Sequence, residues 1–286
     1  MRQLTILQAL HQARRDIDDT DARMLLQSVL NVSHAHLVAR PEHELTPEQA
    51  QFFRLLTARR VHGEPVAYLV GKREFYSLDF KVTPAVLIPR PETELLVDLA
   101  LERIPLDCPC KVLDLGTGSG AIALTIAKHR PLADITAVDS SADAVVVARI
   151  NTGHLDVSNV RIIEADWFDG LAAERFDLIV SNPPYVAGGD PHLSQGDLRF
   201  EPRMALTAGA GDDGLDCIRF IITSAPRHLA VDGALLFEHG YDQAEACRHL
   251  LGDAGFRRVF SRPDLAGIMR VSGGRLGSFP RETVRM

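Results

Sequence analysis

The residues best suited to chemistry are Asn182, Pro183, Pro184 and Tyr185, which directly follow the apolar run at 176–181. Such a run predicts a buried strand, so these four residues lie where a strand ends and a loop begins. An asparagine oxygen and backbone carbonyls held by prolines can accept the two protons of a planar amino group, and the tyrosine ring can stack on its face. The pattern favours transfer of a group onto an amide or amino nitrogen.

A glycine-rich loop lies between the first strand and the following helix of the main domain. Its residues are Gly116, Thr117, Gly118, Ser119 and Gly120. Glycines allow a sharp turn and a close approach of the backbone to a ligand, and ligands of open α/β sheets bind at the carboxyl ends of strands. The loop therefore predicts a cofactor site.

The loop alone does not name the cofactor, because Gly116, Gly118 and Ala121 also fit the dinucleotide fingerprint. Asp139 ends the second strand and is the expected acceptor for ribose hydroxyls with either cofactor. Asp114 ends the strand that precedes the glycines. Its carboxylate can hold the ammonium group of a methionine moiety directly or through water, which favours S-adenosyl-L-methionine.

The third strand ends in Asp166 and Trp167, which also favour S-adenosyl-L-methionine. The carboxylate can accept from an adenine amino group, and the indole can cover the ring. Methyl transfer from a sulfonium is an in-line displacement, so the main task of the site is alignment. We expect Asn182 and the Pro183 carbonyl to accept the two N–H bonds of the acceptor nitrogen, with no general base and no metal required.

The bulk composition limits the function classes. The net charge is −7, and residues 1–75 hold 10 Lys and Arg against 9 Asp and Glu. A protein that grips a nucleic-acid backbone usually has a basic face, so this balance lowers the odds of a nucleic-acid substrate. The start of the chain lacks the apolar region of a signal peptide, and no long apolar run is present, so we expect a cytoplasmic protein without membrane contact. Cys108 and Cys110 are expected to be free thiols.

The chain is expected to divide into several parts. Leucine and phenylalanine stripes at helical spacing predict an N-terminal helical domain at 1–64, with Thr46 capping its third helix. The stripes include Leu7, Met24 and Phe52. Residues 65–88 are predicted to be a β-hairpin linker with strand-like residues at 75–82, the catalytic domain is expected at 89–273, and 274–286 are expected to be a tail.

Beyond residue 110, strands alternate with helices. Strands are predicted at 111–115, 135–138, 160–164, 176–180, 234–238, 258–261 and 268–271. Helices are predicted near 119–129, 141–151, 214–229 and 242–252. This alternation with short connections predicts an α/β fold with a doubly wound, mainly parallel sheet.

Several segments occur together in the order typical of one family. They are Gly71 with Phe75, 88–94, 114–120, 137–139, 166–168, 181–185 and 236–240. The chain resembles the bacterial HemK/PrmC family of glutamine methyltransferases that act on peptide chain release factors. The resemblance covers about residues 1–272 and is weakest in the helical part.

The resemblance implies a class I, Rossmann-like, seven-stranded methyltransferase domain that uses S-adenosyl-L-methionine. It implies methylation of the glutamine in the Gly-Gly-Gln motif of class-1 release factors, with the helical domain and hairpin contacting the release factor. It places Gly116 to Gly120, Asp139, Trp167 and Asn182 at the cofactor, and Asn182 to Tyr185 at the glutamine. The residues beyond 272 run past the usual end of the family.

Three alternatives remain open from the residues. The Asn-Pro-Pro-Tyr motif is shared with adenine-N6 methyltransferases of DNA, which the acidic charge disfavours. A dinucleotide-dependent oxidoreductase would leave that motif without a purpose. A non-catalytic module with the same fold is disfavoured because both halves of the site are intact.

Overall fold

The computed structural model describes residues 4–207, 209 and 213–277, and the chain forms two compact units. The first unit contains the residues up to Lys72 together with Ser194–Phe200, and the second contains the remaining residues from Arg73 onward. Within the described ranges, no helix is long and apolar enough to cross a membrane.

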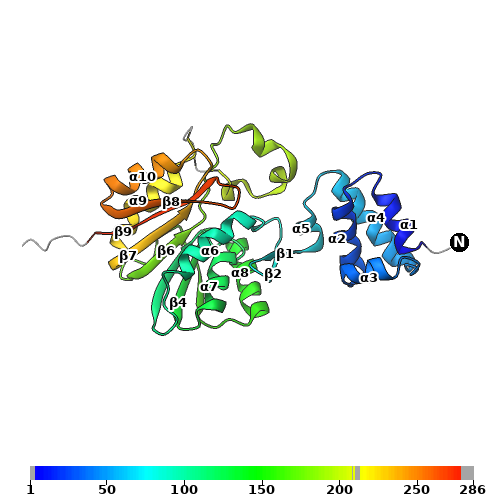
Figure 1. Ribbon diagram of the computed structural model, residues 1–286, viewed down its shortest axis with the longest axis horizontal. Helices are drawn as coiled ribbons and strands as arrows, with labels where there is room; N and C mark the ends of the chain where they lie inside the picture. The colour runs from blue at the N-terminus through cyan, green and yellow to red at the C-terminus, as the bar shows by residue number, and fades with distance from the viewer. Residues whose placement is uncertain (1–3, 208, 210–212, 278–286) are drawn as a thin grey trace, which may run out of the picture. The chain divides into compact units, whose positions relative to one another are not determined.

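The first unit is helical (Figure 1). Its helices are α1 (Ile6–Ala13), α2 (Asp19–Leu30), α3 (His34–Ala39), α4 (Pro47–Val61) and α5 (Val66–Val70). Thr46 caps α4 as predicted, because its side chain accepts from the backbone of Gln49 while the Gln49 side chain accepts from the backbone of Thr46. Arg60 at the end of α4 bonds both Asp21 and Asp197, which ties the Ser194–Phe200 segment into this unit.

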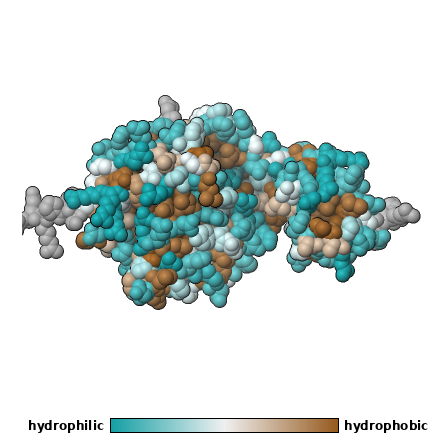
Figure 2. All heavy atoms as spheres, in the orientation of Figure 1, coloured by the Kyte–Doolittle hydropathy of each residue, from teal (hydrophilic) through white to brown (hydrophobic). Residues whose placement is uncertain are grey.

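The core of the helical unit differs in part from the predicted stripes. Phe53 and Leu56 are buried in it, whereas Phe52 on the same helix is 49% exposed. Leu7 and Met24 are exposed as well. The helices that the stripes predicted are confirmed, but these three side chains lie outside the core, because helical spacing alone does not say how wide the buried face is. Hydrophobic areas are visible on the surface of this unit (Figure 2).

The second unit contains a seven-stranded sheet with the order β5-β4-β3-β6-β7-β9-β8. Its strands are β3 (Cys110–Leu115), β4 (Ala133–Asp139), β5 (Val160–Glu164), β6 (Phe176–Ser181), β7 (Leu229–Glu238), β8 (Phe256–Pro263) and β9 (Met269–Leu276). The first five are parallel, and β9 is antiparallel to both β7 and β8. The seven predicted strands are confirmed, and the order reverses between β3 and β6.

Helices cover both faces of the sheet (Figure 1). They are α6 (Glu94–Leu101), α7 (Ala121–His129), α8 (Ala142–Leu155), α9 (Asp216–Ser224) and α10 (Ala244–Asp253). Two separate cores result. Val112 packs with α6 and α7, whereas the next residue, Leu113, packs with α9 and α10, because successive strand side chains point to opposite faces. This is the doubly wound architecture that the sequence predicted.

The segment predicted as a hairpin linker is a helix followed by a short hairpin. Residues Val66–Val70 form α5, and the strands β1 (Lys72–Phe75) and β2 (Leu78–Lys81) flank a turn inside the segment 75–82 that was predicted to be strand-like. Tyr76 and Ser77 adopt positive φ angles of 52° and 59° in this turn. The turn was missed because hairpin turns of this kind usually contain Asn or Gly. Here Glu94 Oε1 accepts from the Tyr76 amide at 2.8 Å.

The C-terminal part of the sheet extends further than predicted. The strand predicted at 268–271 runs on to Leu276, so residues 274–276, which were assigned to the tail, pair with both β7 and β8. Gly273 and Gly274 suit this strand, because a Cβ on Gly273 would lie 2.5 Å from the Leu235 carbonyl oxygen. Residues 278–286 of the predicted tail lie outside the described residues.

Candidate active site

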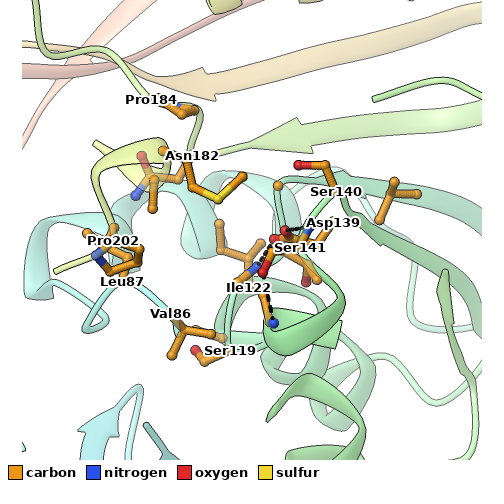
Figure 3. Close-up of a pocket in the computed structure, with 18 of the residues that line it drawn as sticks. Val86, Leu87, Ser119, Ile122, Asp139, Ser140, Ser141, Asn182, Pro184 and Pro202 are labelled. Carbon is orange, nitrogen blue, oxygen red and sulfur yellow. Dashed lines mark hydrogen bonds between the residues drawn. The ribbon is translucent and has the colours of Figure 1, made fainter. Parts of the chain in front are cut away.

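The candidate site lies where the strand order of the sheet reverses. The glycine-rich loop follows β3, and Asn182 follows the neighbouring strand β6. In open α/β sheets such a switch point opens a crevice at the carboxyl ends of the strands. A cavity of about 280 Å³ is found there, and both segments line it (Figure 3).

Most of the predicted site residues line this cavity. They are Gly116, Thr117, Gly118, Ser119, Asp139, Asp166, Trp167, Asn182 and Pro184. Gly120, Pro183 and Tyr185 do not line it, although each adjoins a residue that does. The structure thus brings together, in one hollow, residues that are far apart in the chain.

The glycine-rich loop has a backbone that other residues rarely adopt. Gly116 and Gly118 have φ angles of 70° and 56°, and Gly120 has a φ angle of 84° where it begins α7. A Cβ on Gly120 would meet Leu124 Cδ1 at 2.8 Å, so this glycine lets the helix begin close to the loop. The loop is built by backbone geometry.

Asp139 holds the glycine-rich loop and faces the same cavity (Figure 3). Its carboxylate accepts from the Gly118 amide at 2.8 Å and from the Ser141 amide at 2.9 Å. Burial raises the pKa of this group, and the two amide hydrogen bonds oppose that shift. Each oxygen has a further lone pair, so Asp139 can still accept from hydroxyl groups in the cavity.

Asp114 lies beneath the loop and does not line the cavity. It is fully buried, and its Oδ2 accepts from the Thr117 hydroxyl at 2.7 Å. Its Oδ1 has no hydrogen bond of good geometry within the described residues, although the nearby Ala123 amide lowers the pKa of the group. Burial raises the pKa of Asp114 to about 7. Asp114 therefore orients Thr117 directly, and its contact with an ammonium group stays a prediction.

Trp167 and Asp166 form another wall of the cavity. Trp167 adopts a positive φ of 48°, which is unusual for a bulky residue, and its ring packs against Phe220. A Cβ on Gly116 would lie 3.9 Å from the Trp167 ring, so the indole lies close to the glycine-rich loop. This leaves an apolar ring and a carboxylate beside the loop.

Asn182 is held by a chain of polar groups from other elements. Its Nδ2 donates to Thr93 Oγ1 at 3.1 Å, and the Thr93 hydroxyl donates to Glu238 Oε2 at 2.7 Å. Tyr185 donates its hydroxyl to the other oxygen, Glu238 Oε1, at 3.0 Å. The side-chain oxygen of Asn182 is therefore the end of the amide that is left to accept from a substrate.

Glu238 is fully buried at the end of β7. Burial raises the pKa of Glu238, whereas hydrogen bonds from Thr93 and Tyr185 and the charge of Arg270 lower it. Burial beside this carboxylate also raises the pKa of the Tyr185 hydroxyl, which stays protonated. Thr93 lines the cavity and Glu238 supports it, yet the sequence assigned neither a role.

The segment before Thr93 also reaches the cavity, through Pro89 and Arg90. Glu201, whose side chain is completely buried, pairs with Arg90 and accepts from the Ile88 amide at 3.0 Å. Pro202, next to Glu201, lines the cavity too. This ion pair anchors the loop that follows β6.

His239, Cys108 and Cys110 do not line the cavity. His239 is buried, and its ring bonds the Gly240 carbonyl and Ser272 Oγ at 2.8 and 2.9 Å, which is a structural role. Cys108 is exposed and Cys110 is buried, and both are free thiols as predicted. Across the described part of the chain, no group of three or more acidic, histidine or cysteine side chains could hold a metal ion.

The fold and the site define a class of protein. Residues 93–197 match the family model described as "Methyltransferase small domain". A methyltransferase from Pyrococcus furiosus has the same fold, with a TM-score of 0.54, 20% identity, and coverage of 77% of this chain and 97% of that chain. The Thermus thermophilus 16S rRNA N2 G1207 methyltransferase, solved with AdoMet and guanosine, matches with a TM-score of 0.53, 20% identity, and coverage of 72% and 49%. The second unit is a class I methyltransferase domain.

Closer relatives define the family. Residues 5–71 match the "PrmC N-terminal domain" model. The release factor glutamine methyltransferase of Bordetella pertussis is 52% identical over 90% of this chain and 94% of its own length. That of Escherichia coli is 47% identical over 94% of each. The chain belongs to the release factor glutamine methyltransferase family.

Proposed function

We propose that this protein transfers a methyl group from S-adenosyl-L-methionine to the side-chain amide nitrogen (N5) of the glutamine in the Gly-Gly-Gln motif of class-1 release factors. The observation that carries the proposal is the oriented amide of Asn182. Thr93 takes its N–H, so its oxygen remains as an acceptor in the cavity that the glycine-rich loop also lines. The identity of the substrate in this proposal comes from the family to which the chain belongs.

The residues of the cavity fit S-adenosyl-L-methionine. Asp139 has lone pairs for ribose hydroxyls, Trp167 supplies an apolar face for adenine, and Asp166 supplies an acceptor for its amino group. The glycine-rich loop, from Gly116 to Gly120, leaves room for the methionine part. We assign all of these residues to cofactor binding, together with Asn182.

The chemistry needs alignment more than acid–base catalysis. S-adenosyl-L-methionine supplies an electrophilic methyl group and is converted to S-adenosyl-L-homocysteine. Asn182 Oδ1 and the Pro183 carbonyl would accept the two N–H bonds of the glutamine, which directs the nitrogen lone pair at the methyl group. As the C–N bond forms, positive charge develops on the nitrogen, and these two acceptors stabilise it until one proton leaves to water.

Pro184 and Tyr185 complete the clamp in this proposal. Pro184 lines the cavity and stiffens the chain after Asn182. Tyr185 bonds Glu238 through its hydroxyl, and its ring is only partly buried. The stacking of this ring on the glutamine amide stays part of the proposal.

We assign release-factor recognition to the helical residues 1–64 and the linker at 65–88, and catalysis to residues 89–273. No nucleic-acid substrate, membrane contact or metal is part of the proposal, and the site of action is the cytoplasm, where release factors work. An adenine-N6 methyltransferase acting on DNA or RNA is the alternative, because an adenine amino group would also fit two acceptors. The net charge of −7 weighs against it.

Labelled S-adenosyl-L-methionine tests the proposal. The enzyme is mixed with equal amounts of a purified class-1 release factor and duplex DNA rich in adenine, and label is counted in each after separation. We expect label in the release factor alone. Label that enters the DNA and not the release factor would establish the alternative.

A further inference from the structure

Glu238 is a buried carboxylate that the reaction itself does not use. It ends β7, next to β6, and the residues before Asn182 and Glu238, Ser181 and Phe237, are paired neighbours in the sheet. Both of its oxygens accept hydrogen bonds, one from Thr93 and one from Tyr185. A carboxylate is costly to bury, so its place between two residues of the site requires a reason.

The direction of the hydrogen bonds gives that reason. The Thr93 hydroxyl has one proton, and it points to Glu238 Oε2. Thr93 Oγ1 can then only accept from Asn182, so the group that Asn182 turns toward it must be the NH₂. Glu238 therefore determines, through one hydroxyl, which end of the Asn182 amide faces the cavity.

Tyr185 is fixed by the same carboxylate and by a second residue. Its hydroxyl bonds Glu238 Oε1, and its backbone carbonyl accepts from Gln243 Nε2 at 3.0 Å. The two ends of the 182–185 segment are thus tied to one buried group. A shift of that group would move both ends together.

We propose that Glu238 is a positioning residue for amide methylation. Through Thr93 it holds the Asn182 amide with its oxygen toward the substrate. Its second carboxylate oxygen holds Tyr185. This proposal rests on the proposed function. Glu238 touches neither the cofactor nor the glutamine, and its effect is on the rate of methyl transfer rather than on cofactor affinity. Without the relay, the Asn182 amide can turn over and present its NH₂ to the glutamine, where two donors would face each other.

Two substitutions at Thr93 separate the hydroxyl from the shape of the side chain. Thr93→Val keeps the branched shape and removes the hydroxyl, whereas Thr93→Ser keeps the hydroxyl. We expect Thr93→Val to lower kcat on the release factor by about 10- to 100-fold, and Thr93→Ser to retain at least about half of it. The Kd for S-adenosyl-L-methionine should change by less than about threefold in both.

A matched control is Thr125→Val in α7. Thr125 is also buried, but within the described residues its hydroxyl bonds only the Ala121 carbonyl of its own helix. The Thr125→Val change should lower the free energy of unfolding without lowering kcat.

Glu238→Gln keeps the shape of the side chain but exchanges one acceptor for a donor, so we expect a loss of kcat at least equal to that of Thr93→Val. Because both changes break one relay, the double variant should lose no more than Glu238→Gln alone.

A second measurement needs no substrate. The chain has four asparagines, so ¹⁵N-asparagine labelling gives few side-chain signals, and Asn182→Ala identifies the one from Asn182. Its NH₂ protons should exchange slowly in the wild type and in Thr93→Ser, and faster in Thr93→Val.

A wild type that labels no release factor would overturn the proposed function, while the exchange rates would still test the relay. Equal kcat in Thr93→Val and the wild type, equal losses in Thr93→Val and Thr93→Ser, or unchanged exchange would overturn the relay.

Discussion

The two halves of the site are built in different ways, although each contains a buried carboxylate. In the cofactor half, the backbone of the glycine-rich loop makes the surface beside the side chains of Asp139, Asp166 and Trp167, and Oδ1 of Asp114 beneath the loop has no hydrogen bond of good geometry within the described residues. In the amide half, side chains make the surface, and both oxygens of Glu238 accept hydrogen bonds. The buried carboxylate of the amide half thus has a hydrogen bond on each oxygen, whereas Asp114 of the cofactor half has one on Oδ2 alone.

This difference follows from what each half must do. A loop of backbone amides needs only the right φ and ψ angles, which three glycines provide locally. An amide clamp must distinguish an oxygen from an NH₂ group of nearly equal size, and only directional hydrogen bonds can do that. We therefore expect substitutions in the amide half to reduce the rate, and substitutions in the cofactor half to reduce binding or stability.

The largest expected effect is that of Asn182→Ala. This change removes the acceptor that aligns the glutamine nitrogen, so we expect the single-turnover rate to fall by about 100- to 1,000-fold. Asn182 is only one of the nine residues assigned to the cofactor, so the Kd for S-adenosyl-L-methionine, measured by calorimetry, should change far less than the rate, by less than about tenfold. A comparable loss in affinity would mean that the two halves are not separate.

Asp114→Asn should change how stability depends on pH. The pKa of Asp114 is raised to about 7 in the folded protein, above its unfolded value, so the folded state binds the extra proton between about pH 4 and 7. The free energy of unfolding of the wild type therefore falls across this range, and that fall is absent in the variant. In urea unfolding, the free energy of unfolding of the variant minus that of the wild type should increase by on the order of 2–4 kcal/mol between pH 4 and pH 8. Parallel pH curves would show that Asp114 ionises normally.

Asp139→Ala removes the acceptor for two backbone amides of the cofactor half. We expect the Kd for S-adenosyl-L-methionine to rise by about 10- to 100-fold, while the rate at saturating cofactor stays within about threefold. Asp143→Ala, an exposed aspartate in the first turn of α8, is the control with the same charge change and should leave the Kd unaltered. A fall in rate with normal affinity would reverse the roles of the two halves.

Cys108→Ser should have the smallest effect. Cys108 is exposed, and burial raises the pKa of the nearby Cys110 thiol to about 11, so Cys110 is not activated. Activity and unfolding free energy should match the wild type within about twofold and about 0.5 kcal/mol. A large loss would indicate a metal or redox site at Cys108 and Cys110.

The parts of the site that are consecutive in the chain could be predicted from the sequence. The glycine-rich loop, Asp139 and Asn182 each follow a recognisable strand, and the sheet brings them together. Thr93 and Glu238 were not assigned roles because they lie 145 positions apart, and only the fold joins them to Asn182. The segment at 236–240 supported only the family resemblance, because nothing in its local pattern shows that Glu238 contacts Thr93 and Tyr185.

The hairpin shows the same limit in the fold. The turn at Tyr76 and Ser77 has no Gly or Asn to indicate it, and a distant carboxylate, Glu94, helps to hold it. Asn151, which is fully buried in α8, bonds both Lys81 of the hairpin and the Ser119 carbonyl of the glycine-rich loop. Local pattern thus predicted the strands and helices, whereas the polar groups that fix the loops depend on long-range contacts.

The central claim is that the site acts on one side-chain amide of a protein. The most direct test uses two forms of a class-1 release factor, one with Gly-Gly-Gln and one with Gly-Gly-Glu, in the same reaction with trideuteromethyl-labelled S-adenosyl-L-methionine. Mass spectrometry of the peptides then locates the label. We predict a trideuteromethyl group on the glutamine side chain of the first form and none on the second, because the carboxylate has no N–H for Asn182 and the Pro183 carbonyl to accept. Equal labelling of the two forms, or label elsewhere in the peptide, would contradict the account.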